Sequence, residues 1–168
     1  MVIFISINRY ISMFRKMRRF GQELKKEECE EILIKRPRGV LAILGDNEYP
    51  YSVPLSHVYA NGKIYFHGAK EGHKKEAIKK NSKCSYCVLD EGIKAKDSWW
   101  YTFKSVIVFG KIKTLDNNNE KIKALTFLGD KFFPTHEDTT NEIDRLLDKT
   151  EVFELTIEHM SGKKVKEK

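Results

Sequence analysis

With 168 residues, 40% of them hydrophobic, the chain is long enough for one domain with a single core. Its three cysteines are an odd number, which does not suit a disulfide framework. It shows neither a secretory signal nor an apolar run of the about 18 residues that cross a bilayer, which predicts a cytoplasmic protein without a membrane partner. Residues 1–19 supply +5 and residues 163–168 supply +3 of the net charge of +7, which leaves −1 for the rest and argues against a nucleic-acid partner.

In the first half of the chain, sequence patterns predict one helix and three strands. Residues 24–36 have apolar positions three and four apart and acidic first turns, which is typical of a helix, and Pro37 and Gly39 end it. The apolar run at 39–44 predicts a buried strand. Residues 51–59 alternate, and Pro54 lacks an N–H, so this strand is expected at a sheet edge or with a bulge. The pair Asn61-Gly62 predicts a tight hairpin into a strand at 63–68.

The second half is predicted to contain three helices and three strands. Residues 73–81 form a short basic helix, and residues 119–132 and 140–149 carry helical apolar stripes. Strands are expected at 83–91, at about 100–115 and at 151–160. The six strands are mostly linked by hairpins, and no alternation of strand, helix and parallel strand is found. The predicted fold is therefore mainly β: a closed or partly open antiparallel barrel with peripheral α-helices.

The stretch from residue 64 to residue 81, IYFHGAKEGHKKEAIKKN, has the residue types of an anion site between a strand and a helix. Gly68 and Gly72 allow close approach of a ligand to the backbone, and the helix start offers free N–H groups. His73 and Lys74 lie in the first helical turn, where positive charge opposes the helix dipole unless an anion binds there. A phosphate is the obvious candidate. The alternative is that the lysines of this helix only form a solvated face, and the spacing matches no P-loop.

No metal site is predicted from the cysteines and histidines. Cys84 and Cys87 form a single C-x-x-C on a strand, where positions three apart point to opposite faces and suit neither zinc nor a disulfide. His57, His136 and His159 show no metal-ligand spacing. The neighbouring Trp99 and Trp100 are interpreted as a core or dimer-interface pair, with the wall of a substrate pocket as the alternative.

Several segments together resemble a known family. YPYSVPLSHVYANGKIYFHGAKEGHKKEAIKKN at 49–81 is similar to the flavin-binding region of the 5-nitroimidazole resistance proteins, a nitroreductase-like branch of the pyridoxamine-5'-phosphate-oxidase-like FMN-binding split barrels. The segments MFRKMRR (13–19), ECEEIL (28–33), GVLAILGD (39–46), YTFKSVIVFGK (101–111) and IEHMSGK (157–163) also match. The resemblance implies a six-stranded antiparallel split barrel of Greek-key type over residues 13–162. Residues 1–12 are then an extension outside the family pattern, consistent with a start at Met13 or Met17, and residues 163–168 are a basic tail.

The resemblance implies a cofactor, FMN, bound near the interface of a homodimer. By position, Gly72, His73 and Lys74 match the turn and the basic pair that hold the flavin phosphate. His67, Gly68 and Ala69 match the segment beside the ribityl chain. Ser52, Val53 and Pro54 match the strand along the isoalloxazine ring. Ser105 matches a polar contact from the long strand.

The function that the resemblance implies is that of an FMN-dependent reductase of small aromatic acceptors such as 5-nitroimidazoles, converting a nitro group to an amine. His67 matches a histidine that is important in that branch, and it is the candidate catalytic residue, able to polarise or protonate the acceptor. The alternative for His67 is a strand histidine satisfied by a backbone partner. The alternative function is that of an FMN carrier or sensor that catalyses no reaction of its own. A second alternative is that the protein is a haem-binding relative. His73 stands where the oxidases have arginine, and the chain lacks their extended Arg/His C-terminal segment, which argues against pyridoxamine phosphate oxidation.

Overall fold

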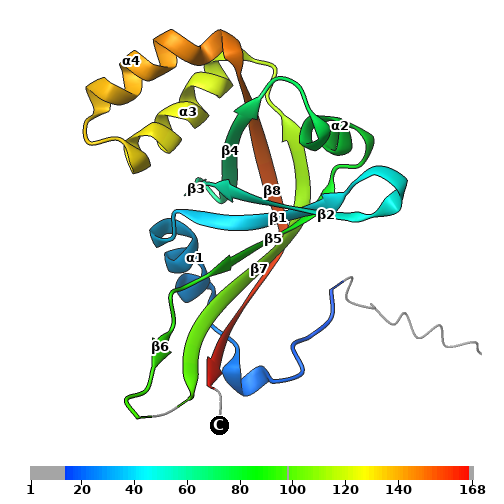
Figure 1. Ribbon diagram of the computed structural model, residues 1–168, viewed down its shortest axis with the longest axis vertical. Coiled ribbons are helices and arrows are strands. Elements are labelled where there is room, and N and C mark those ends of the chain that lie inside the picture. The colour runs from blue at the N-terminus through cyan, green and yellow to red at the C-terminus, as the bar shows by residue number, and fades with distance from the viewer. Residues whose placement is uncertain (1–13, 98, 167–168) are drawn as a thin grey trace, which may run out of the picture.

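The computed structural model describes residues 14–97 and 99–166, and the predicted extension 1–12 lies outside them. The described chain forms a strongly curled antiparallel sheet with helices at its periphery, and a helix pair, α3 and α4, projects from one end (Figure 1). No helix within the described ranges has the length and apolar character needed to cross a bilayer.

The sheet follows the order β2-β1-β5-β7-β8-β4-β3, and the short β6 pairs with β7 outside this path. All pairs are antiparallel. The strands are β1 (Arg38–Leu44), β2 (Pro50–Ser56), β3 (Val58–Ala60), β4 (Lys63–Ala69), β5 (Lys83–Leu89), β6 (Ile93–Lys94), β7 (Tyr101–Thr114) and β8 (Thr150–Lys166). The two ends of the path approach each other where β2 contacts β4, which gives a split barrel. As expected from Pro54, β2 is an edge strand.

The predicted fold class is confirmed, but the predicted number of six strands is wrong, because the described residues form eight. His57 interrupts the strand predicted at 51–59: its N–H donates to the carbonyl oxygen of Pro37 at 3.1 Å, outside the strand ladders, and β2 and β3 are therefore separate. The two-residue β6 arises in a stretch without a strand pattern. Residues 163–166, which the sequence placed in a basic tail, continue β8 and pair with β7.

Four α-helices lie around this sheet: α1 (Lys26–Lys35), α2 (His73–Lys80), α3 (Asn118–Phe132) and α4 (His136–Leu146). The first three agree with the prediction within two residues. The fourth was predicted to begin at residue 140 and begins four residues earlier, because the Thr135 hydroxyl accepts a hydrogen bond from the Asp138 N–H at 3.1 Å and caps the helix there.

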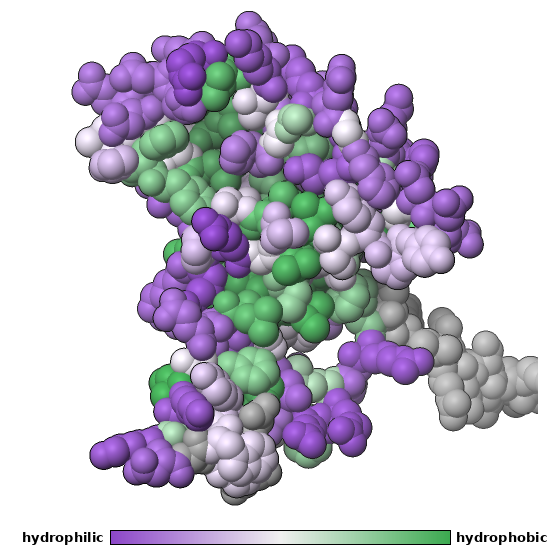
Figure 2. Space-filling view, viewed as in Figure 1, coloured by the Kyte–Doolittle hydropathy of each residue, from purple (hydrophilic) through white to green (hydrophobic). Residues whose placement is uncertain are grey.

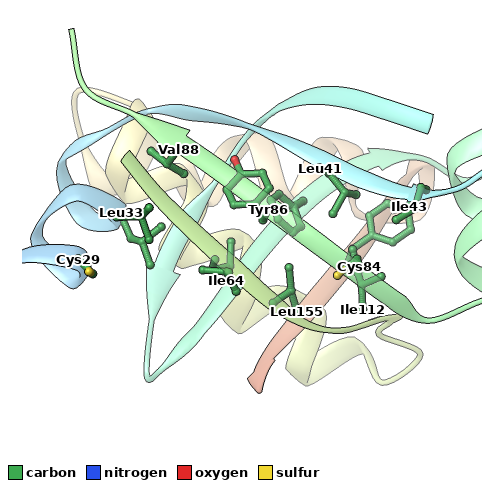
Figure 3. Close-up of a cluster of buried hydrophobic side chains, with 14 of the residues drawn as sticks. Cys29, Leu33, Leu41, Ile43, Ile64, Cys84, Tyr86, Val88, Ile112 and Leu155 are labelled. Carbon is green, nitrogen blue, oxygen red and sulfur yellow. The ribbon is translucent and has the colours of Figure 1, made fainter. Parts of the chain in front are cut away.

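The barrel interior is filled by a cluster of aliphatic and aromatic side chains from α1, α2 and most of the strands (Figure 3). Tyr86 is its largest fully buried side chain and packs edge-on against Phe66, with ring centroids 4.9 Å apart. A Cβ on Gly39 would lie 2.6 Å from the Tyr86 ring, so the backbone of β1 passes this ring only as glycine. The core therefore fixes the position of β4, which carries part of the candidate site.

A second, smaller cluster lies on the opposite face of β4, between that strand and α3. Along β4, Phe66 belongs to the barrel interior and Tyr65 to the α3 side, as the alternation of a strand requires. Gly68 therefore faces the barrel interior and His67 faces the α3–α4 side. This division determines which residues of the conspicuous segment can act together.

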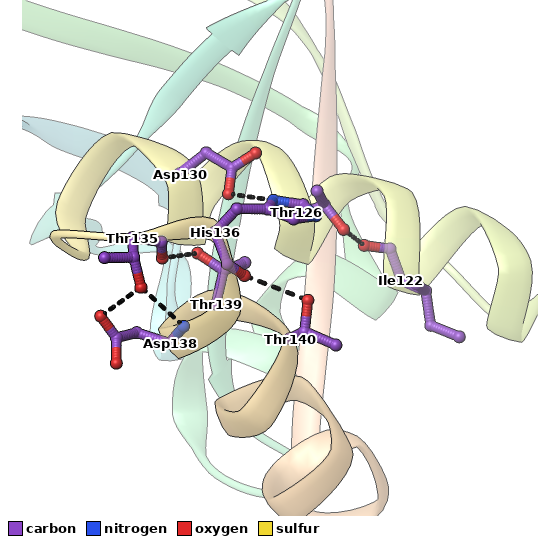
Figure 4. Close-up of polar contacts among 8 residues, drawn as sticks. All are labelled: Ile122, Thr126, Asp130, Thr135, His136, Asp138, Thr139 and Thr140. Atoms are coloured by element: carbon purple, nitrogen blue, oxygen red, sulfur yellow. Dashed lines mark hydrogen bonds and ion pairs between the residues drawn. The ribbon is translucent and has the colours of Figure 1, made fainter.

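The helices α3 and α4 form a tight hairpin (Figure 4). A Cβ on Gly129 would collide with the side chain of Thr139, which is 1% exposed, so the helices approach closely at this point. Beside it, the imidazole Nδ1 of His136 lies 2.8 Å from Asp130 Oδ1. These contacts hold the two helices at a fixed spacing.

Candidate functional site

The first turn of α2 lacks the side-chain cap that α3 and α4 have. Asn117 and Thr135 accept from first-turn N–H groups of α3 and α4, whereas Gly72 precedes α2 with φ 116° and offers no side chain. Apart from its two chain neighbours, no described residue has an atom within 4 Å of the place where a Gly72 Cβ would be. No described side chain accepts from the N–H groups of this turn, so these groups and the positive end of the helix dipole are available to an anion.

Lys74 carries a half-buried positive charge at the same end of α2. Its Nζ lies 5.0 Å from the centroid of the Phe153 ring, beside Gly68 on the interior side of β4. A Cβ on Gly68 would lie only 2.6 Å from this Nζ, so the glycine leaves the room that the lysine occupies. Burial lowers the pKa of Lys74. None of the described carboxylates pairs with it, so apart from the Phe153 ring its charge has no compensating group among the described residues.

The carboxylate of Glu151, which is paired with Gly68 across β4 and β8, is already engaged by two other lysines. Lys75 Nζ lies 2.5 Å from Glu151 Oε2, and Lys121 Nζ lies 3.6 Å from Oε1. Burial raises the pKa of Glu151, but the hydrogen bond and charge of Lys75 and the charge of Lys121 outweigh this and lower it overall. Neighbouring lysines on α2 therefore differ: Lys75 is neutralised within the fold and Lys74 is not.

His73 points away from Lys74, towards the loop between β1 and β2. Its ring stacks on Tyr51 with centroids 4.2 Å apart, and its Nε2 lies 3.5 Å from Asp46 Oδ2. The same carboxylate lies 3.1 Å from Lys80 Nζ, and the hydrogen bond and charge of Lys80, with the charge of His73, lower the pKa of Asp46. The two predicted counter-charges of a phosphate thus border the uncapped turn from different sides.

His67 lies on the α3–α4 face of β4 and is accessible to solvent, although protein surrounds its ring on several sides. That surrounding protein, and then the positive charge of Lys74, lower the pKa of His67, so its imidazole is neutral at pH 7. No described residue hydrogen-bonds to this imidazole. The alternative role, a strand histidine satisfied by a backbone partner, therefore finds no support in the described part of the chain.

A cavity of about 210 Å³ opens in front of His67, between β4 and the α3–α4 hairpin. Its walls are mainly aliphatic and aromatic. His67 and Ser56 are among its few polar lining residues, and Glu142 at its border is held by Arg145 through hydrogen bonds of 2.6–3.1 Å. This cavity was not foreseen from the sequence, because its walls come from segments about 60 to 80 positions apart.

The other predicted cofactor-binding residues divide into two groups. Ser52, Val53 and Pro54 follow Tyr51 on the edge strand β2, so they begin beside His73. Ala69 ends β4 next to the loop that leads to α2.

Ser105 lies far from this region within one chain. Its partner on β8 is Lys163, whereas the partner of His67 on β8 is Val152, eleven positions away and thus about 36 Å along the strand. The structure therefore places Gly68 and Lys74 together and the start of β2 beside His73, whereas His67 lies on the other face of β4 and Ser105 lies apart.

Two of the other motifs are also placed by the structure. The rings of Trp99 and Trp100 stack on each other at 4.5 Å near the start of β7 and do not line the cavity at His67. Cys84 lies in the barrel core and Cys87 on the opposite face of β5, as predicted for positions three apart on a strand. Among the described residues no cluster of histidine, cysteine and acidic side chains suits a metal ion.

Comparison with known proteins gives one family and a set of similar folds. A family model described as pyridoxamine 5'-phosphate oxidase matches residues 25–164. No curated protein sequence matches the chain. Among solved structures, a candidate 5-nitroimidazole antibiotic resistance protein from Bacteroides thetaiotaomicron has 20% identity and a TM-score of 0.71, with 86% of this chain and 87% of that chain covered.

Two further solved structures are named for flavin binding. An FAD-binding protein from Mesorhizobium loti is 25% identical, with a TM-score of 0.64 over 86% of this chain and 97% of that one. An FAD- and haem-binding protein from Mycobacterium smegmatis is 19% identical, with a TM-score of 0.71 over 85% of this chain and 73% of that one. All three share the curled antiparallel sheet with the present chain.

Proposed function

Because the chain belongs to the pyridoxamine 5'-phosphate oxidase family, we propose that it binds a flavin whose phosphate lies at the uncapped start of α2. The observation that carries this proposal is Lys74: a half-buried ammonium group without a carboxylate partner, next to free N–H groups. An anion at the start of α2 can accept hydrogen bonds from the Lys74 ammonium group and from the free N–H groups together. Flavin-binding proteins among the similar structures support the same ligand class.

We propose FMN as the flavin. FMN ends in a phosphate monoester, whose three terminal oxygens can accept from the first-turn N–H groups and from Lys74 together. In FAD the corresponding phosphate is a bridging diester with fewer free oxygens. His73 borders the same turn, where a phosphate can draw it away from Asp46. The residues Ser52, Val53, Pro54 and Ala69 remain the proposed contacts along the rest of the flavin.

We further propose that the protein reduces small aromatic acceptors such as 5-nitroimidazoles. A bound flavin supplies the electron transfer, and the chain supplies binding, orientation and exclusion of water. His67 faces the cavity with a neutral imidazole, which can donate one hydrogen bond and accept another, and so can polarise a nitro group; it can deliver a proton only after the ring has taken one up from solvent. Likeness to the Bacteroides structure supports this substrate class.

The experiment that tests these proposals begins with the colour of the purified protein. We expect a flavin absorption spectrum, and FMN as the compound released on denaturation and identified by its mass. Under anaerobic conditions with a reductant and a 5-nitroimidazole, the loaded protein should remove the nitro absorption faster than the same concentration of free FMN does.

Each alternative gives a different result in that experiment. A colourless protein that takes up neither FMN nor FAD contradicts the flavin proposal. Released FAD contradicts the choice of FMN alone, and a haem spectrum favours a haem-binding relative. A yellow protein that reduces the nitroimidazole no faster than free FMN is a carrier or sensor rather than a reductase.

The outer face of the sheet supports a second copy of the chain as partner. Pro54, Val40, Cys87 and Ile107 lie in register across four neighbouring strands on this face, and Val40 and Ile107 are 37% and 39% exposed. Figure 2 shows hydrophobic residues exposed across the middle of the molecule, bordered by hydrophilic ones. Such patches mark interaction surfaces. Ser105 lies two positions before Ile107 on the same face, so only a partner copy could bring it to a flavin.

We therefore expect the protein to be a homodimer, with a mass by light scattering of about twice 19.6 kDa. The variant Ile107→Lys places a charge in the proposed interface and should shift the protein towards the monomer. Ile122→Lys, which changes an equally exposed isoleucine on α3, should leave the mass unchanged. A wild-type protein that remains monomeric at the highest concentrations measured contradicts the dimer.

A further inference from the structure

The cavity in front of His67 is a built feature of the fold. Gly129 and Thr139 set how closely α3 and α4 approach, and the His136–Asp130 contact holds the turn between them (Figure 4). Below that contact, Leu125 on α3 and Ile143 and Leu146 on α4 line a volume of about 210 Å³ that protein atoms do not fill. These contacts fix the two helices to each other as one unit, which forms one wall of the cavity and faces His67 on β4.

The cavity lies on the other side of β4 from Lys74. Gly68 and Phe66 face the barrel interior, where Lys74 is found, whereas His67 and Tyr65 face the hairpin. A ligand between β4 and the helices is therefore separated from the anion site by the thickness of one strand. The cavity is a candidate for a second ligand rather than for the phosphate.

The chemistry of the walls restricts that ligand to an uncharged molecule. Most lining side chains are aliphatic or aromatic, and the charge of Glu142 is compensated by Arg145. The Thr150 hydroxyl donates to the carbonyl oxygen of Leu146 at 2.9 Å and is likewise satisfied. The imidazole of His67 and the hydroxyl of Ser56 each offer both a donor and an acceptor to a ligand in the cavity.

The volume of the cavity restricts the size of the ligand. An apolar cavity of about 150 Å³ already holds one benzene molecule. The cavity here holds one ring with a small substituent, and not a flavin together with a substrate. We propose that the cavity under the α3–α4 hairpin binds a single small, uncharged aromatic molecule, with His67 as its hydrogen-bond partner. That this molecule is also the electron acceptor rests on the proposed function; that the cavity binds it does not.

The probe for this proposal is nitrobenzene, which is one uncharged ring with hydrogen-bond acceptors, and toluene is its non-polar counterpart. In the purified protein with whatever cofactor it carries, nitrobenzene should shift the methyl NMR signals of Leu125, Ile143 and Leu146, and leave those of the exposed Ile93 and Ile122 unchanged. Nitrobenzene should bind several-fold more tightly than toluene. His67→Phe should keep toluene binding and remove that preference.

Variants that fill the cavity give the matched comparison. Leu146→Trp should weaken nitrobenzene binding at least about tenfold, whereas Ile122→Trp, on the exposed side of α3, should not. Leu125→Phe fills the cavity from the other helix, should one variant fail to fold. Unchanged binding in the folded filling variants, or methyl shifts away from the hairpin, overturns the proposal.

Flavin content, read from the visible spectrum of each variant, separates this proposal from the proposed function. A protein without flavin whose cavity methyls still respond to nitrobenzene keeps the cavity site and loses the flavin. A flavin-loaded protein whose cavity methyls do not respond keeps the flavin and loses the cavity site.

Discussion

Replacing Lys74 by methionine is expected to weaken FMN binding by about 1–3 kcal/mol, or about 5- to 150-fold in Kd, the range for a lost hydrogen bond to a charged group. Methionine retains an apolar side chain against Phe153 and removes only the charge. In the flavin-free protein the same change should raise the free energy of unfolding, because an unpaired, desolvated ammonium group is removed from the fold. Isothermal titration with FMN and urea unfolding of the flavin-free protein measure the two effects.

Lys79 provides the matched control on the same helix. It is exposed, and it forms no ion pair with the described residues, so Lys79→Met changes the net charge equally without touching the proposed site. We expect FMN affinity and stability close to those of the wild type. Equal loss of affinity in both variants would mean that the basic helix acts only through its overall charge, and no loss in Lys74→Met would remove Lys74 from the site.

A second large effect is expected from His57, in the dependence of stability on pH. This residue is fully buried between β2 and β3; its Nε2 lies 2.8 Å from the carbonyl oxygen of Leu33 and its Nδ1 lies 3.0 Å from the Tyr86 hydroxyl. The carbonyl can only accept, so Nε2 carries the proton, and the unprotonated Nδ1 shares the single Tyr86 hydroxyl proton with the Leu55 carbonyl oxygen, which lies 3.1 Å from that hydroxyl. Burial, and then the charge of Lys131, lower the pKa of His57 to about 4, against the raising effect of the Leu33 hydrogen bond.

The sign of the effect follows from the two pKa values. The unfolded chain protonates His57 near pH 6.5 and the folded chain near pH 4, so between these values the unfolded state binds more protons. The contribution of His57 to the free energy of unfolding is fully present above pH 6.5. It decreases as the pH falls to 4, by about 3 kcal/mol in total. Urea unfolding at several pH values measures this slope.

The variant His57→Gln should be less stable at pH 7, because it loses the contact with Tyr86, but its stability should fall less steeply below pH 6.5. His136→Gln removes an exposed histidine instead and serves as the control. If His57→Gln and the wild type lose stability in parallel between pH 6.5 and pH 4, His57 is not the group responsible.

The fold was predictable because its main signals are local. Alternation, the Asn61-Gly62 turn and the edge position required by Pro54 all act over a few residues, and each is found in the structure. The break between β2 and β3 was not predictable. It depends on the contacts of His57 with Pro37, Leu33 and Tyr86, and the alternating pattern continues unchanged through this position.

The candidate site divides in the same way. The uncapped start of α2 and its bases were predictable, because strand, glycines and helix lie in one continuous segment. The orientation of His73 towards Asp46 and Tyr51, and the engagement of Glu151 by Lys75, depend on strands that are distant in the sequence. Pattern analysis could have placed α3 and α4 near each other, but not the cavity between them and His67.

The position of β8 has a consequence for the synthesis of the protein. This strand, Thr150–Lys166, comes last in the sequence and yet lies in the middle of the sheet, between β7 and β4. While the ribosome has not yet released it, β7 and β4 each keep an unpaired edge that can join to another nascent chain. The barrel can therefore close only after residues 150–166 have been synthesised, and a chain that stops before residue 150 lacks the strand that joins its two halves.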